Sequence, residues 1–452
     1  MTMVKLCLVV VLASFAQGIK WQSLKKFNPF KTLNGLASTT ATIPSVSTPS
    51  REALNVRIDD SWIDLSGWRK AHPAGDHWID MYKGRDATEV MYAFHSDSAM
   101  QMMQRLPKSK TAEGLEEAVP KVTEITRNFR KLREQLVKDG WWERDMLHEA
   151  RLFSIWASLF ASGLFVAKGI PLLGVFLLAL ANTSAGWIGH DYIHGTDKFS
   201  FRMRNFASLA AGMSPTWWSD KHNKHHAVPN EVGVDEDLAT DPALYVYAPT
   251  TTKDSPLRKF QHFYVPIAFS WLFAIWRIDS AKVCIKDALS GFKRKTQWES
   301  VFQLAHYALM AAFVPLPVFL GSVFFAGLVT AIIVTVTHQS EDLFWGFNPD
   351  FVLSQFLSTR NAKCNTLFSD WLWGGMQWQL EHHLFPSMPR SKYPALSGVI
   401  QKFASENGLE YRITEEFALI RKNWDMYKRV AEEPSRDQLP FTDISPNNVL
   451  LQ

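Results

Sequence analysis

The sequence predicts a multidomain protein in which a small soluble domain precedes an all-α membrane domain of four transmembrane helices and further helices outside the bilayer. Three observations lead to this fold class. The chain has 452 residues, which leaves room for two or three domains. Hydrophobic residues make up 47 % of it, yet the mean hydropathy is only −0.10, which is typical of soluble segments mixed with apolar spans. Long apolar runs begin after residue 150, and clusters of histidine lie beside them.

Charge and cysteine content argue against two other classes of protein. The formal net charge is +4 and both signs are interspersed, so the composition indicates no nucleic-acid partner. The three cysteines, Cys7, Cys284 and Cys364, are far apart and form no CxxC pair. This excludes a disulfide framework and a thiolate metal site, and it fits a reducing compartment.

Residues 1–18 resemble a secretory signal, with Lys5 ahead of the apolar run Leu6 to Phe15. That run is too short for a transmembrane helix, which needs about 20 residues. Three interpretations stay open: a signal for the endoplasmic reticulum, an uncleaved apolar extension, or a misplaced start codon. Residues 19–51 follow as a linker whose second half is rich in Ser, Thr and Pro.

A small soluble domain is predicted over residues 52–135, where the composition is mixed, charged and contains tryptophan. At the other end of the chain, residues 391–452 carry no further apolar span. We therefore expect them to form a cytosolic C-terminal region.

Two helical hairpins are predicted to cross the membrane. The first pairs residues 152–167 with residues 172–188, and the second pairs residues 302–320 with residues 324–337. We place the turn of the second hairpin at residues 316–321.

The distribution of charge sets the orientation of these hairpins. Lys168 is the one basic residue in the two turns, whereas Lys and Arg gather at 198–224 and 282–295. The positive-inside tendency then places the soluble domain and the histidine clusters on the cytosolic face. The shorter run at 263–276 is interpreted as an interfacial segment, because a fifth span would separate the clusters across the bilayer.

Eight histidines are candidate metal ligands. The first cluster directly follows the second predicted span, and the lone His338 directly follows the fourth. The eight are His190, His194, His222, His225, His226, His338, His382 and His383. Within each cluster the spacing is that of one helical face, so each cluster is expected to direct its side chains to one point. Helices leaving the bilayer would then converge on a single site at the membrane boundary.

The number and type of these residues indicate redox metals. Neutral imidazole is a good ligand at neutral pH, and eight are too many for one tetrahedral zinc. They suit two first-row metals, and oxygen activation favours iron. Nearby carboxylates are expected to orient the rings from outside, namely Asp191, Asp235, Asp237 and Glu381.

Three further residues near these clusters need separate interpretations. Gln379 opens the third cluster and is a metal ligand, a water-holding neighbour or a helix-surface residue. His262 and His306 are interpreted as interfacial or hydrogen-bonded residues rather than ligands.

The histidine motifs HDxxH, HxxHH and QxxHH, in this order, resemble those of the membrane fatty acyl desaturases. The glutamine of the third motif resembles the front-end and sphingolipid branch. The resemblance covers roughly residues 150–430 and implies a membrane desaturase domain at 150–390. It also implies that the eight histidines bind two irons and form the catalytic site.

A second resemblance concerns the soluble domain. His72-Pro73-Ala74-Gly75, followed by His95, resembles the HPGG motif of cytochrome b5 and its second axial histidine. It implies a small α+β domain that binds haem b through His72 and His95 and passes electrons from NADH through a separate NADH–cytochrome b5 reductase.

One departure from the HPGG motif is Ala74, which stands where that family has glycine. If this position needs left-handed backbone geometry, the loop is strained by about 1 kcal/mol. The alternative to haem binding is a degenerate domain that keeps only the fold. The whole arrangement is also similar to insect proteins called cytochrome b5-related, a name that assigns no substrate.

Together these resemblances imply an oxidoreductase of the endoplasmic reticulum membrane that desaturates fatty acyl chains with O₂, on acyl-CoA or acyl-lipid. The expected partners are the bilayer, the acyl substrate and the reductase, and no nucleic acid. Two alternatives remain: a lipid hydroxylase on the same di-iron site, and a haem-bearing membrane redox partner without turnover. Trp373 and Trp378, before the third motif, belong either to an interfacial aromatic belt or to an acyl channel.

Overall fold

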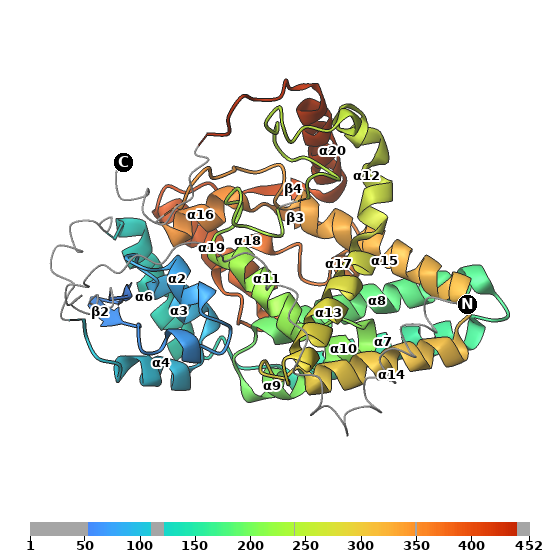
Figure 1. The fold of residues 1–452 in the computed structure, drawn as a ribbon, viewed down its shortest axis with the longest axis horizontal. Helices are drawn as coiled ribbons and strands as arrows, with labels where there is room; N and C mark the ends of the chain where they lie inside the picture. Colours follow the sequence, from blue (N-terminus) through green and yellow to red (C-terminus); the bar gives the residue numbers. More distant parts are fainter. Residues whose placement is uncertain (1–52, 110–121, 239, 349, 441–452) are drawn as a thin grey trace, which may run out of the picture. The chain divides into compact units, whose positions relative to one another are not determined.

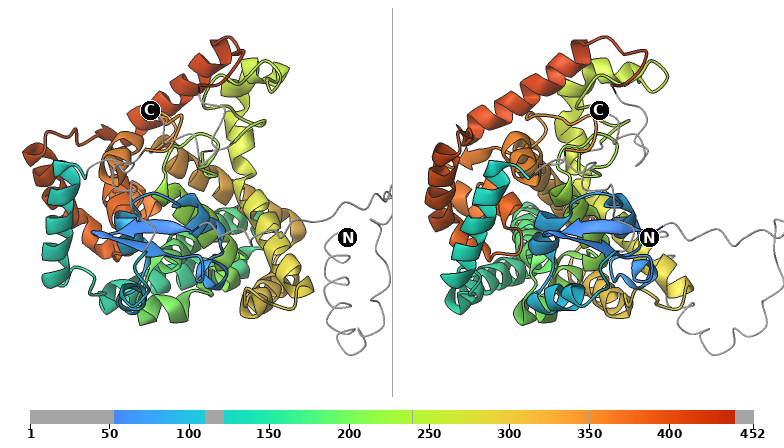
Figure 2. Two further views of the ribbon diagram at one scale, coloured as in Figure 1. Left: turned by 60° about the vertical axis from the view of Figure 1, so that its left-hand side comes forward. Right: turned by 90° about the vertical axis from the view of Figure 1, so that its left-hand side faces the viewer.

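The computed structural model describes residues 53–109, 122–238, 240–348 and 350–440. The signal-like segment 1–18 and the linker 19–51 lie outside these residues. Figures 1 and 2 show the elements, which are mostly helices, with two short pairs of strands.

The N-terminal part of the described chain is a small α+β domain, as expected. Strands β1 (Asn55–Ile58) and β2 (Ser61–Asp64) form an antiparallel hairpin. Its turn places Asp59 at φ 53°, a left-handed geometry that Asp tolerates better than most residues. The 3₁₀ turn η1 (Arg69–Ala71) follows. The helices of this domain are α2 (His77–Met81), α3 (Thr88–Phe94) and α4 (Asp97–Gln104).

Two features hold this domain together. Alternate strand residues such as Val56, Ile58 and Ile63 pack with Tyr82 and Met100 in one apolar core. Helix α4 begins where the Ser96 hydroxyl accepts a hydrogen bond from the Ala99 amide, which satisfies a free donor of its first turn.

Helix α6 (Glu124–Lys138) lies outside that core. Its residues Phe129 and Leu136 are buried with Phe385 and Phe403, which come from the C-terminal half of the chain. The helix therefore packs on the part of the protein that carries the third histidine motif.

In the part of the chain that the structure describes, three helices are long and apolar enough to cross a membrane: α7 (Met146–Val166), α8 (Pro171–His194) and α15 (Leu316–Val336). Helix α8 packs against both α7 and α15. Pro171 occupies the first turn of α8, where its fixed φ favours helix initiation and its missing N–H costs nothing.

The second predicted hairpin differs from the observed one. Helix α14 (Gln297–Phe313) ends before Val314 and Pro315, and Leu316 already begins α15. The turn predicted at 316–321 is therefore wrong. Gly321 lies inside α15, where an added Cβ would approach Val175 of α8 to 3.0 Å, so this glycine allows close helix packing. Because α14 is not among the candidate spans, the expected four spans are not confirmed.

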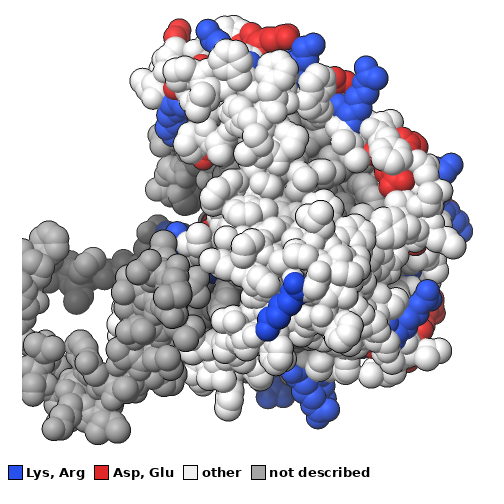
Figure 3. Space-filling view, turned by 90° about the vertical axis from the view of Figure 1, so that its right-hand side faces the viewer, with Lys and Arg blue, Asp and Glu red and all other residues white. Residues whose placement is uncertain are grey.

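Apolar side chains cover the outside of the candidate spans. Phe165 and Leu172, at the connection between α7 and α8, are 89 % and 84 % exposed. Figure 3 shows a face with few charged side chains across its middle and most of its charges towards the rim. An exposed apolar surface of this kind is expected to contact lipid.

Shorter helices follow α8 and α15 and connect them to the rest of the chain. They are α9 (Lys198–Met203), α10 (Phe206–Ala211), α11 (Pro215–Ala227), η2 (Pro256–Phe260), α12 (Gln261–Ser270), α13 (Leu272–Leu289), α16 (Phe351–Ser358), α17 (Leu367–Trp373) and α18 (Gln379–Leu384). The segment 263–276, expected as one interfacial piece, bends at Trp271 between α12 and α13.

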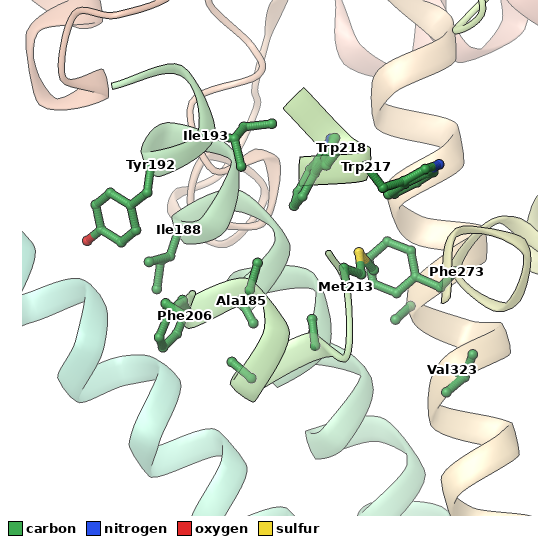
Figure 4. Close-up of a cluster of buried hydrophobic side chains, with 14 of the residues drawn as sticks. Ala185, Ile188, Tyr192, Ile193, Phe206, Met213, Trp217, Trp218, Phe273 and Val323 are labelled. Carbon is green, nitrogen blue, oxygen red and sulfur yellow. The ribbon is translucent and has the colours of Figure 1, made fainter. Parts of the chain in front are cut away.

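One apolar cluster joins the helices that carry the first two histidine motifs. Figure 4 shows Ile193 of α8 near Trp218 of α11 and Ile188 of α8 near Phe206 of α10. Phe273 of α13 and Val323 of α15 belong to the same cluster. The burial of these side chains fixes α8 against α11 and so sets the distance between the two motifs.

The C-terminal region packs onto the same body. It comprises η3 (Arg390–Lys392), α19 (Tyr393–Glu406), β4 (Ile413–Glu415) and α20 (Glu416–Glu432). Strand β4 pairs in parallel with β3 (Asn361–Lys363), and the Gln261 side chain of α12 donates to the Tyr427 carbonyl of α20. Within residues 391–440 the structure has no candidate membrane span, as expected.

Candidate metal centre

All eight predicted histidines come together, in two groups of possible metal ligands. The first group holds His190, His194, His222, His226 and His382, and the second holds His225, His338 and His383. In each group the candidate ligand atoms lie within 4.8 Å of one another. Seven of the eight rings are buried, and His222 is half-buried.

Four segments of the chain supply these residues. The first motif is the last turn of α8, the second lies on α11, and the third lies on α18. His338 follows the end of α15. The apolar core described above and the C-terminal helices hold these four segments against one another.

The second and third motifs do not each direct their side chains to one point, contrary to expectation. His222 and His226 are four residues apart on α11 and share a group, whereas His225 joins the other group. One residue along a helix turns the side chain by about 100°, since a turn takes 3.6 residues. His382 and His383 separate for the same reason, so these two motifs contribute to both groups.

The ring nitrogens inside each group approach one another closely. His190 Nε2 lies 2.8 Å from His222 Nε2, and His222 Nε2 lies 3.3 Å from His226 Nε2. In the second group, His225 Nε2 and His338 Nε2 are 3.4 Å apart. Ligands bound about 2.0–2.1 Å from a common ion are separated by about 3 Å, so these spacings fit metal coordination.

Several of these nitrogens have no other partner in the described residues. The Nε2 atoms of His194, His382 and His383 are buried without a hydrogen bond. Burying an imidazole nitrogen unpaired is costly, because it loses its hydrogen bond to water. A metal at the centre of each group removes that cost, and the residues therefore fit such ions.

Hydrogen bonds from outside fix the orientation of five rings. His222 Nδ1 donates to Asp237 at 2.6 Å, and His225 Nδ1 donates to Asp235 at 2.7 Å. In the other three rings, Nδ1 is hydrogen-bonded to the Ser358 carbonyl for His338, to the Gln355 side chain for His383 and to the Tyr393 hydroxyl for His382. With Nδ1 engaged, Nε2 is left to face the centre of its group.

Two of the four carboxylates expected to orient the rings do something else. Asp191 forms an ion pair with Arg390 at 3.0 Å, and Glu381 accepts hydrogen bonds from Asn361 and Tyr411. Adjacency in sequence misled here, because the neighbour of a ligand on a helix points about 100° away from it. The expected role of Asp235 and Asp237 is confirmed, because each accepts a hydrogen bond from the Nδ1 atom of a histidine in the site.

The electrostatics of the site favour neutral imidazoles. Burial lowers the pKa of His226, His382 and His383 well below its usual value, and the neighbouring imidazoles lower it further. His225 differs: burial lowers its pKa, but the charge and hydrogen bond of Asp235, together with the charge of Asp237, raise it overall. Neutral rings keep the lone pair that a metal requires.

Gln379 belongs to the site and is not a helix-surface residue. It is buried, and its Nε2 lies 2.7 Å from His338 Nε2, while its Oε1 has no partner in the described residues. Since amide oxygen and nitrogen can be exchanged by a flip, this side chain can offer either a ligand oxygen or a hydrogen-bond donor to the second group.

The other histidines near the motifs are not part of either group. His306 Nδ1 donates to the Leu209 carbonyl, and the His262 ring packs on Phe263 and Trp424. Trp373, for which a membrane-surface position was one option, is buried and donates to Glu416.

The α+β domain holds the second candidate site. The rings of His72 and His95 face one another with centroids 6.1 Å apart. Each Nδ1 is hydrogen-bonded to a nearby backbone carbonyl, that of Gly75 for His72 and that of Met91 for His95. Burial lowers the pKa of His95 to about 4. Two neutral rings at this separation, each with its Nδ1 engaged, are the residues that would hold a haem in this domain.

Ala74 does not strain the haem loop. The left-handed geometry falls on Gly75, at φ +110°, and Ala74 is not among the non-glycine residues with positive φ. The position that requires glycine is therefore occupied by Gly75, and the strain considered for Ala74 is absent.

Residues 167–415, more than half of the chain, match the family described as Fatty acid desaturase. The chain belongs to this family. Residues 52–112 match the Cytochrome b5-like Heme/Steroid binding domain, which covers His72 and His95. The desaturase thus carries a cytochrome b5-like domain fused ahead of its membrane part.

Curated relatives align with most of the chain. The chain is 29 % identical over 395 residues to the Delta(8)-fatty-acid desaturase of Euglena gracilis, which covers 80 % of this chain and 93 % of the relative. It is 28 % identical over 430 residues to the Delta(6)-fatty-acid desaturase of Caenorhabditis elegans (84 % and 96 % covered). The Acyl-lipid 8-desaturase of Rebecca salina is also 28 % identical (84 % and 92 %). Fatty-acid desaturases are oxidoreductases, and this desaturase is one.

Sequence reasoning found the histidines but missed three of their partners. Gln355, Ser358 and Tyr393 lie on α16 and at the start of α19, in segments without a histidine motif. No spacing rule connects them to the rings they orient, because the contacts arise only when α16, α18 and α19 pack together.

Proposed function

We propose that this chain is a front-end-type fatty acyl desaturase that introduces a double bond into acyl-CoA or acyl-lipid, with O₂ as oxidant and electrons from its own cytochrome b5-like domain. The observation that carries the proposal is the convergence of eight imidazoles, largely buried, in two adjacent groups, in five of which the Nε2 atoms approach one another within 3.4 Å. Such a donor set suits iron and leaves room for further ligands.

The eight histidines are assigned as metal ligands and the catalytic site, with His72 and His95 as haem ligands. Two iron ions held there would supply the oxidising power that removes two hydrogens from adjacent acyl methylenes, while O₂ and two added electrons become water. No acidic or basic side chain can abstract hydrogen from an unactivated methylene, so the redox metal is essential to this assignment.

The chain's own residues prepare the site for that chemistry. Asp235 and Asp237 hold two rings in the tautomer that presents Nε2, and they add negative charge beside the metals. Lys221 pairs with Asp237 at 2.6 Å, and together with His222 it keeps the pKa of that carboxyl low despite burial. The buried residues around α8 and α11 exclude water from one side of the site.

The finer assignments follow from the same proposal. The haem domain would span 52–135, with its apolar core ahead of α6 and with α6 as the segment that packs on the C-terminal half of the chain. The membrane domain would span 150–390, and a cytosolic C-terminal region 391–452. The protein would be a multi-pass protein of the endoplasmic reticulum membrane, with haem and histidines facing the cytosol. Electrons would come from NADH through a separate NADH–cytochrome b5 reductase.

Expression in a desaturase-deficient yeast, followed by mass analysis of total fatty acids, tests this function. The wild-type chain is expected to give new double bonds, and His225→Ala and His383→Ala are expected to abolish them. His262→Ala is the matched control, because that ring lies outside both metal groups. Hydroxylated acyl chains would instead identify a hydroxylase. Haem absorption without any new lipid would identify a redox partner.

A further inference from the structure

Helix α3 brings the haem domain directly against the metal groups. It runs from Thr88 to Phe94, and the haem-ligand candidate His95 caps its C-terminus. The Phe94 ring lies 6.4 Å from the His194 ring and 6.3 Å from the His226 ring, centroid to centroid. A single peptide bond and one aromatic contact therefore separate a haem ligand from two ligands of the first metal group.

Polar contacts hold α3 in this place from its other end. Glu89 accepts a hydrogen bond from Arg130 Nε of α6 at 2.6 Å, and the side chains are only 11 % and 24 % exposed. The guanidinium of Arg133 lies over the Tyr92 ring, with its Cζ atom 4.2 Å from the ring centroid. Burial strengthens charge pairs of this kind and makes the loss of one partner costly.

A third contact lies at the edge of the domain. The Arg85 guanidinium stacks on Phe347 at 3.9 Å, and the Tyr82 ring meets the edge of the same phenyl ring. Phe347 thus touches the haem domain but, among the described residues, makes no ring contact with a metal-group histidine, unlike Phe94.

The contact between α3 and α6 is not tightly filled. A cavity lies there, lined by Glu89, Tyr92, Arg130, Trp142 and Phe385 among others. Side chains of α3 and of α6 thus line one shared pocket, which marks where the two helices meet.

We propose that α3 is the intramolecular docking element of the haem domain and that Phe94 is the positioning residue that brings the haem next to His194 and His226 for electron transfer. This rests on the proposed function. Haem carries one electron at a time. Converting –CH₂–CH₂– and O₂ to –CH=CH– and two waters needs two external electrons and two protons, so the haem must be reduced twice by the NADH–cytochrome b5 reductase for each double bond.

The first test measures haem re-oxidation directly in the full-length protein. The haem is reduced anaerobically, the protein is mixed with O₂ and acyl substrate, and the haem absorption bands are followed with time. Phe94→Ala is expected to slow re-oxidation on the order of tenfold, the loss typical of truncating a central aromatic anchor. Phe94→Trp is expected to restore most of the rate. Haem content, midpoint potential and non-haem iron content should stay unchanged.

Phe347→Ala is the matched control, because it removes a phenyl ring from the same interface but from a different place. It is expected to slow re-oxidation less than Phe94→Ala does. If Phe94→Ala re-oxidises its haem at the wild-type rate with its iron intact, or if the two variants slow it equally, the assignment to Phe94 is overturned.

The docking surface has a test that needs no metal. Arg130→Lys allows a carbodiimide to join that side chain to Glu89, and mass spectrometry should detect the linked peptides. Glu89→Arg and Arg130→Glu should each slow haem re-oxidation, and the double exchange should recover it. Absence of the link, or no recovery in the double variant, would contradict the docking.

These outcomes separate the docking from the proposed function. If iron-loaded wild-type protein re-oxidises its haem faster than iron-free His225→Ala but makes no new double bond, the function fails and the docking stands. If double bonds form while every α3 variant keeps the wild-type rate, the function stands and the docking fails.

Discussion

At the scale of single residues, Asp237 is the side chain whose effect on the metals is easiest to isolate. It accepts the Nδ1 hydrogen of His222, and its negative charge makes that ring a better ligand. Asp237→Asn keeps the size but weakens the acceptor, so the affinity for iron should fall about 10–100-fold. Titration of bound iron with a competing chelator measures this.

Glu236→Gln is the control for that experiment. Glu236 lies between the two orienting carboxylates in sequence, but it is exposed and pairs with Lys224 instead of a ring. The Glu236→Gln protein should bind iron with the same affinity as the wild type. Equal affinity in Asp237→Asn would show that the hydrogen bond to His222 does not support metal binding.

The altered haem motif gives a second prediction at this scale. Gly75 has φ +110°, and an added Cβ would lie 2.8 Å from His77 Nδ1. Gly75→Ala should therefore destabilise the haem loop by about 1 kcal/mol or more and speed haem dissociation. Ala74→Gly should change haem dissociation little, because Ala74 is not in the left-handed region. A larger effect at Ala74 than at Gly75 would contradict this assignment.

At the scale of elements, the contact between α17 and α8 places the third motif beside the first. Gly374 ends α17 with φ +60°, and a Cβ there would come within 2.1 Å of the Trp187 ring on α8. Trp187 in turn donates to the Leu372 carbonyl. Gly374→Ala should force these helices apart and lower both the melting temperature and the iron content.

The matched glycine for that test is Gly398, inside α19, where an added Cβ meets nothing within 4 Å. Gly398→Ala should stabilise the protein by about 0.5–1 kcal/mol, because glycine is a poor helix former. Thermal unfolding of the two variants side by side measures the difference. Equal effects would show that the approach of α17 to α8 is not tight.

Element boundaries also show where sequence reasoning stops. The runs at 152–167 and 172–188 correspond to α7 and α8, because Pro171 marks the turn and the flanking runs are clearly apolar. The second turn was misplaced because Leu316 to Gly321 is apolar on both sides and contains a glycine. Only the packing of Gly321 on Val175 shows that the glycine serves a helix contact.

At the scale of the whole molecule, the candidate spans predict which segments cross to the lumen. The turn between α7 and α8, at Lys168 and Gly169, should be luminal, since the motifs at the other end of α8 would be cytosolic. A glycosylation acceptor inserted at this turn should be modified in microsomes, whereas one inserted beside Glu236 should not. The reverse pattern would overturn the proposed orientation.

The histidine motifs made the location of the candidate metal site predictable, but not its internal arrangement. Spacing showed that His222, His225 and His226 lie on one helix. Their division between two groups depends on how α11 faces α18 and the end of α15, which is set by packing over the whole chain. The position of α3 beside His194 likewise could not be predicted from the local sequence. Nothing in the sequence around Phe94 distinguishes it from other phenylalanines, and its contact with His194 appears only in the structure.

The central claim is that distant histidines hold two iron ions beside a haem domain, and metal analysis of the purified full-length protein tests it most directly. We predict two non-haem irons and one haem iron per chain, with the non-haem iron lost in His225→Ala and the haem iron lost in His95→Ala. Protein that folds and binds haem but contains no non-haem iron would contradict the account.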